Sequence, residues 1–168
     1  MARIPMGTIK STIKSLLDTA NTTTGSPIDL SDGLVNRVQK VLEVNVDRIP
    51  IQPSFFPCIT MFVESKVVTL QDIAKNMLTG RRKAEVDLKV VGIIWLDDIN
   101  TTNFELKDLA DNECEQLMEN VEQVLRSDPT IGGKADWSKA TDVTYHNVLD
   151  EDAHFRTGIL NYSISVYY

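Results

Sequence analysis

The sequence predicts an α+β domain whose four-stranded sheet, antiparallel or mixed, consists of two hairpins joined by a helix, with helices packed on one face. Three patterns lead to this prediction. Two apolar strand patterns lie at 58–63 and 85–96, a long amphipathic helix pattern covers 106–126, and an alternating strand pattern covers 159–168. The 168 residues suit one domain with one core, which we place at 1–168.

The first 42 residues carry two helix patterns. Thr8 can cap the first, and with the polar segment that follows it predicts a helical N-terminal extension at 1–28. Ser31 can open the second helix, which we expect to be a core element, with the first as an appendage. The first apolar stripe is Ile9, Ile13, Leu16, Leu17 and Ala20, and the second is Leu34, Val35, Val38, Val41 and Leu42.

A proline-marked stretch leads into the first strand. Three prolines within 50–57 favour extended chain, and a short apolar strand at 58–63 follows them. The next segment, 64–84, has two interpretations. Thr69 could cap a short helix at 70–78, or the strands on either side could continue into a long hairpin arm.

The segment 85–96 has the strongest strand pattern in the sequence. One face is apolar throughout, while the other begins with Asp87 and Lys89 and then becomes apolar. We therefore expect this strand to project from the sheet at its start and to be buried on both sides at its end. The first face carries Val86, Leu88, Val90, Ile94 and Leu96, and the second ends in Val91, Ile93 and Trp95.

An acidic helix is predicted at 106–126. Between Glu105 and Asp128 there are eight acidic and two basic residues, so this stretch carries 2 − 8 = −6 of the formal charge of −7. A solvated helix face is the usual meaning of such a run, and a basic surface for gripping DNA is not apparent. The inward stripe is Ala110, Cys114, Leu117, Val121, Val124 and Leu125.

Two strands follow the helix. Asp128 and Pro129 end the helix, and a Gly-Gly turn leads to a strand near 143–148. The strand at 159–168 alternates apolar and polar residues, as a half-buried antiparallel strand does.

None of the common catalytic or metal-binding motifs is present. The segment Gly132-Gly133-Lys134 lacks the other residues of a phosphate loop, and a helix precedes it rather than follows it. We expect His154 in a polar hairpin turn between the last two strands, and two cysteines without neighbouring ligands indicate buried thiols. We therefore expect no enzyme activity, no cofactor and no metal. No segment has the length or composition of a membrane span or a secretory signal.

One basic cluster stands just before the long strand. Arg81, Arg82 and Lys83 would by default form a solvated turn, but they could also contact an acidic surface on a second copy of the chain. A contact between unlike patches is what a head-to-tail ring requires. With the polar start of the strand, the subunit-contact candidates are Arg81, Arg82, Asp87 and Lys89.

From about residue 30 onward, the pattern resembles the tail-terminator family of long-tailed bacteriophages. The resemblance is one of layout, and 125–133 is the segment most similar to the family. Residues 8–20 and the helix interpretation of 70–78 depart from it. The segments that carry it are DLSDGLVNRVQKVL, PSFFPCITMFVE, RKAEVDLKVVGIIW and VEQVLRSDPTIGG, followed by the strand that ends at Tyr168.

The resemblance implies a structural virion protein of the neck, assembled in the host cytoplasm. Such proteins form a ring, usually hexameric, on the last ring of tail tube protein, stop its polymerisation and present a surface to the head-completion or connector protein. A contractile tail adds the sheath protein as a partner. DNA passes through such a ring without specific binding, so fixed negative charge would suit its lumen. The lumen-facing candidates are Asp111, Glu115, Glu119 and Glu122.

Two other functions remain open. A head-closure or neck adaptor protein would have a similar size and a similar lack of motifs. From a different class, a small regulatory ligand-binding domain or a small enzyme would also suit two hairpins with packed helices.

Overall fold

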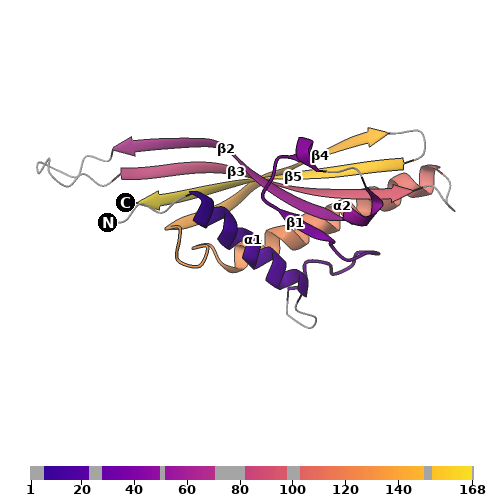
Figure 1. The fold of residues 1–168 in the computed structure, drawn as a ribbon, viewed down its shortest axis with the longest axis horizontal. Coiled ribbons are helices and arrows are strands. Elements are labelled where there is room, and N and C mark those ends of the chain that lie inside the picture. Colours follow the sequence, from indigo (N-terminus) through magenta and orange to yellow (C-terminus); the bar gives the residue numbers. More distant parts are fainter. Residues whose placement is uncertain are drawn as a thin grey trace, which may run out of the picture.

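The computed structural model describes residues 6–22, 28–49, 52–70, 82–97, 103–149 and 153–167. Figure 1 shows a long, twisted sheet with the helices lying across it. The helices are α1 (Met6–Thr22) and α2 (Asn103–Ser127), with two short 3₁₀ turns, η1 (Val46–Arg48) and η2 (Pro53–Phe55). The strands are β1 (Lys40–Leu42), β2 (Cys58–Leu70), β3 (Arg82–Asp97), β4 (Trp137–Leu149) and β5 (Ala153–Tyr167).

Within the described residues, five strands form one mixed sheet in the order β1-β2-β3-β5-β4. Strand β1 pairs with β2 in parallel, and the other neighbours are antiparallel. The α+β class and the two hairpins joined by a helix are confirmed. The predicted number of four strands is wrong, because the short β1 adds a fifth strand at the β2 edge and makes the sheet mixed.

The second predicted helix, which was to begin at Ser31, is also wrong. Residues 30–33 form a turn, where Gly33 has a φ of 73°, and the chain then extends into β1. Contacts with α2 explain the difference. The Asn120 side chain donates hydrogen bonds to the carbonyls of Leu30 (3.1 Å) and Asp32 (2.8 Å). These tertiary bonds satisfy backbone groups that a helix would otherwise pair within itself.

Glu113, which precedes Asn120 in α2, also binds this segment. Its Oε1 accepts the backbone N–H of Val35 at 2.8 Å, while Oε2 is buried without a hydrogen-bond partner among the described residues. Burial raises the pKa of this carboxyl, and the bond from Val35 offsets part of the effect. The ionised form is therefore less favourable in the folded protein than in the unfolded chain.

We expect the Glu113→Gln variant to change how stability depends on pH. The native carboxyl binds its proton more tightly than the unfolded one, so the free energy of unfolding of the wild type falls as pH rises above 4.5. Glutamine removes that contribution, so the variant should gain stability relative to the wild type between acid and neutral pH. Denaturant unfolding across this range measures it, with Glu115→Gln, exposed on the same helix, as the control. Parallel pH profiles for wild type and Glu113→Gln would contradict it.

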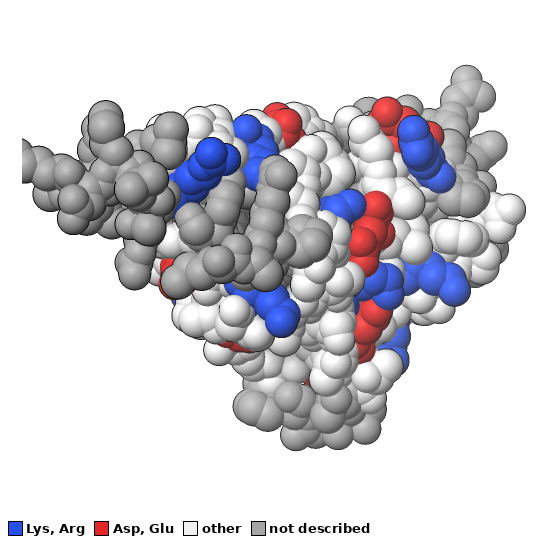
Figure 2. Space-filling view, turned by 60° about the vertical axis from the view of Figure 1, so that its left-hand side comes forward, with Lys and Arg blue, Asp and Glu red and all other residues white. Residues whose placement is uncertain are grey.

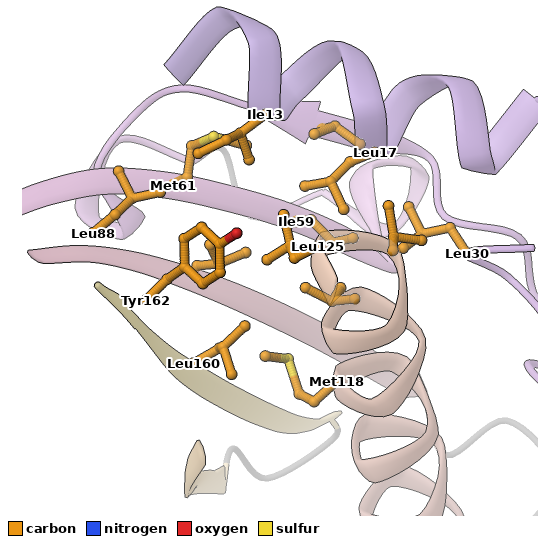
Figure 3. Packing of buried hydrophobic residues seen from close by; sticks show 14 of the residues in the cluster. Ile13, Leu17, Leu30, Ile59, Met61, Leu88, Met118, Leu125, Leu160 and Tyr162 are labelled. Atoms are coloured by element: carbon orange, nitrogen blue, oxygen red, sulfur yellow. The ribbon is translucent and has the colours of Figure 1, made fainter. Parts of the chain in front are cut away.

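Helix α1 belongs to the main core. Its Ile9, Ile13 and Leu17 are fully buried and pack in the same cluster as the sheet and α2. Figure 3 shows Ile13 and Leu17 pointing down onto Met61 and Leu125. The first helix is thus a core element and not an appendage. The second segment also reaches the core, through Leu30, Val38 and Val41, but it is not a helix.

The core lies between the helical layer and one face of the sheet. The complete predicted inward stripe of α2 is buried, from Ala110 to Leu125. Alternate residues of the central strands meet it, as Figure 3 shows for Leu88, Leu160 and Tyr162. The Tyr162 hydroxyl lies 2.6 Å from Ser138 Oγ, which also donates to the Pro129 carbonyl at 2.6 Å. This chain of bonds connects β5 and β4 to the turn after α2.

Two glycines allow α2 to lie close to the sheet. Gly92 of β3 and Gly158 of β5 are register partners on neighbouring strands. A Cβ built on Gly158 would lie 2.4 Å from Met118 Cγ, and one built on Gly92 would lie 2.7 Å from Met118 Sδ. The pair therefore forms a notch that the Met118 side chain fills.

Strands β2 and β3 form a long hairpin arm. They stay paired from Cys58↔Ile93 to Leu70↔Arg82, with one irregularity near Glu64. Figure 1 shows these paired ends extending beyond the helices. The arm interpretation is thus confirmed for 64–70 and 82–84. The rest of the helix interpretation at 70–78 lies outside the described residues.

Candidate subunit-contact surfaces

The first candidate surface is the outer end of the arm, which we define as residues 66–70 with 82–84. It contains three basic residues and no acidic one. Val67 and Val68 are 54% and 44% exposed. Arg82 is exposed at the start of β3, and Arg81 lies outside the described residues. The three bases are Lys66, Arg82 and Lys83.

The charges of β3 are largely paired with neighbours. Asp87 accepts a hydrogen bond from Ser65 at 2.6 Å, and Lys89 forms an ion pair with Glu64 at 2.7 Å. Lys83 pairs with Glu85, and this bond raises the pKa of the lysine. Figure 2, which is turned toward the side on which the arm lies, shows basic and acidic side chains interleaved. Two predicted contact residues, Asp87 and Lys89, thus already have partners within the chain.

The second candidate surface is the acidic stripe, which we define as Asp111, Glu115, Glu119 and Glu122. Spaced by three or four residues, they lie along one side of α2, as predicted for helical neighbours. Glu115 and Glu119 contribute to the raised pKa of Tyr145 on β4, after burial and the Cys114 thiol. The structure therefore brings all four together on the β4 side of the helix.

The four acids differ in their contacts. Asp111 forms an ion pair with Arg156 at 3.0 Å, and Glu122 pairs with Arg126 one turn along the helix. Glu115 and Glu119 are exposed and have no ion-pair partner among the described residues. Of the four acids in the stripe, only Glu115 and Glu119 offer negative charge that no ion pair among the described residues compensates.

The third candidate surface is an apolar hollow on the sheet face opposite the helices. A second cluster buries Phe56, Cys58, Val91 and Ile93 there, which confirms that β3 is buried on both faces toward its end. The hollow has a volume of about 280 Å³. Its described lining is Val46, Asp47, Ile49, Phe56, Ile93, Phe155 and Thr157.

Three aromatic rings form one wall of this region. Trp95 and Phe155 stack at 5.4 Å, and Phe56 meets both edge-on at 5.6 and 5.7 Å. Such edge-to-face contacts add to the stability that burial alone gives. The Trp95 Nε1 atom is buried and has no hydrogen-bond partner among the described residues.

Sequence reasoning did not find this hollow. It depends on η1 and η2, whose short segments fold back over the sheet from outside the strands. Two features of the sequence pointed toward it. The second face of β3 is apolar and therefore has to pack against another segment, and the proline-marked stretch contains Phe55 and Phe56. Neither indicates how much space the covering segments leave.

The thiols are unsuited to surface chemistry. Cys58 and Cys114 are both fully buried, and burial raises the pKa of each to about 12. Among the described side chains, no group of three or more His, Cys, Asp and Glu could hold a metal ion. In the same part of the chain, no helix is both long and apolar enough for a membrane span.

The chain matches no protein-family model and no curated protein.

Proposed function

We propose that this protein is a non-enzymatic virion assembly protein, a tail terminator that forms a ring on the phage tail tube. The observation that carries the proposal is the presence of unlike, spatially separated contact surfaces on one chain. The outer end of the arm, with its three basic residues, belongs to the β2 side of the sheet, whereas the acidic stripe lies on the β4 side. Together with the family resemblance in layout, this arrangement supports a head-to-tail ring.

Unlike surfaces favour a ring for a geometric reason. A patch that binds a different patch on an identical copy leaves one of each free, so addition continues until the rotation closes. A closed ring of this kind could bind the open end of the tail tube without exposing a new surface to which another tube subunit can bind. It would end polymerisation and give the head-completion or connector protein, and any sheath protein, a new surface to bind.

DNA must pass through a ring in this position. Fixed positive charge in its lumen would retain DNA, and fixed negative charge would repel it. We place Glu115 and Glu119 of the acidic stripe toward the lumen, because their charge is uncompensated. Asp111 and Glu122 contribute less, since Arg156 and Arg126 partly neutralise them. The protein would act in the neck of the virion and be present in the host cytoplasm during assembly.

Reversing the charge of the arm should weaken the ring. We expect the Arg81→Glu/Arg82→Glu variant to self-associate roughly tenfold more weakly, with a larger effect at low salt, where screening is least. Sedimentation or light scattering over a concentration series measures this. A Lys10→Glu/Lys134→Glu variant makes the same change in net charge at other sites and should associate as the wild type does. If both variants associate as strongly as the wild type, the two arginines are solvated and do not contact a neighbouring subunit.

A further inference from the structure

We propose that the arm of one copy docks in the apolar hollow of the next copy, with Val67 as the inserted side chain. This inference rests on the head-to-tail ring of the proposed function and names the two surfaces that meet. At the arm, the sequence predicted a contact between charged residues only, and this proposal adds a specific and mostly apolar contact.

The arm offers apolar side chains at an open strand edge. Strand β1 pairs only with Cys58–Thr60, so within the described residues β2 has no strand on its outer side beyond that point. Val67 and Val68 are exposed along this open portion. Exposed apolar residues on a free edge are a liability in a monomer, and natural proteins usually cover them.

The hollow offers an apolar surface that the described residues leave uncovered. Ile93 and Phe155 come from the sheet, while Val46 and Ile49 come from the segment around η1. The space has a volume of about 280 Å³, and its described lining is apolar apart from Asp47 and Thr157. Branched aliphatic side chains suit such a site.

The arm cannot fill the hollow of its own molecule. Val67 pairs with Glu85, whereas the hollow includes Ile93, which is 93 − 85 = 8 residues further along the same strand. At about 3.3 Å per residue this separation is roughly 26 Å. Because one strand carries both surfaces at a fixed separation, only a second copy can bring them together, and we place this contact head-to-tail, as the proposed ring requires.

Charge supports the same pairing. At the outer end of the arm, Lys66 and Arg82 have no ion-pair partner among the described residues, whereas Lys83 is paired with Glu85, the register partner of Val67. Asp47 is exposed and is the only charged residue among the described lining of the hollow. An apolar insertion flanked by lysine and arginine therefore meets an apolar site with a carboxylate on its wall, which favours this orientation over others.

Disulfide trapping between two single-substitution variants tests the docking. Val67→Cys places a thiol on the arm and Thr157→Cys places one in the hollow, while the native cysteines are buried. We expect a disulfide-linked dimer when the two variants are mixed and mildly oxidised, and none from either variant alone. A disulfide needs Cα atoms within about 7 Å, so the link reports direct docking.

Two comparisons make the result decisive. Thr144→Cys, exposed on the same sheet face, should not link to Val67→Cys, and Glu119→Cys tests whether the arm meets the acidic stripe instead. A link to Glu119→Cys, or oligomers in solution without any link to Thr157→Cys, would overturn the hollow as the docking site but leave the ring intact. Monomers at every concentration, without a link, would overturn both the docking and the proposed ring.

Discussion

Cells infected by a phage with an early stop codon in this gene are expected to contain DNA-filled heads without tails, beside tubes of excessive or uncontrolled length. A tube subunit added to an open end exposes the same surface again, so polymerisation has no intrinsic stopping point. A terminator stops growth by binding that surface without regenerating it. Electron microscopy of the lysate measures both the tube lengths and the fraction of joined particles.

The same lysate distinguishes a terminator from a neck adaptor. Loss of an adaptor on the head side would leave tails of uniform, normal length and heads that leak their DNA. Restoring the wild-type gene from a plasmid should return tubes to normal length and rejoin them to heads. Uniform tails of normal length in the uncomplemented lysate would exclude the terminator function and favour the adaptor.

The second large effect is expected at the glycine notch. Gly158→Ala should lower the free energy of unfolding by about 2 kcal/mol, because the new Cβ would lie 2.4 Å from Met118 Cγ and must displace it within a packed core. Chemical denaturation measures the change. Gly7→Ala makes the same substitution in α1, where nothing lies within 4 Å, and should be neutral or stabilising.

A double variant tests the assigned cause. In a Met118→Ala background the two shortest contacts are removed and only Tyr145 Cε1, at 3.2 Å, remains close to the new Cβ, so adding Gly158→Ala should then destabilise much less than it does in the wild type. Additive effects of the two substitutions would show that the cost at Gly158 arises from something other than contact with Met118.

Strong periodicity explains what the sequence predicted correctly. The apolar strands at 58–63 and 85–96 and the acidic helix combine length with an unbroken pattern, and each forms as predicted. Within 31–42 the apolar spacing also matched a helix. There, Asn120 and Glu113 bind backbone groups from about 80 residues away in the sequence, and no local pattern reports such partners.

The contact surfaces were predictable only in part. The acidic stripe followed from helical spacing, but its division into paired and uncompensated acids depended on Arg156, which reaches α2 from β5. Gly92 interrupts an apolar strand, and a glycine there indicates a close approach by another element. Its register partner Gly158 became apparent only with the strand pairing, which brings residues 66 positions apart side by side (158 − 92 = 66).

The position of β5 has a consequence for synthesis. This strand follows all the others in the chain, yet it lies inside the sheet between β3 and β4. A nascent chain that ends before β5 leaves an edge of β3 open and the main core without Leu160, Tyr162 and Ile164. The sheet therefore closes only after translation has passed through β5. On the proposed function, a prematurely terminated product would lack part of the core that supports its arm and so could not take a place in the ring.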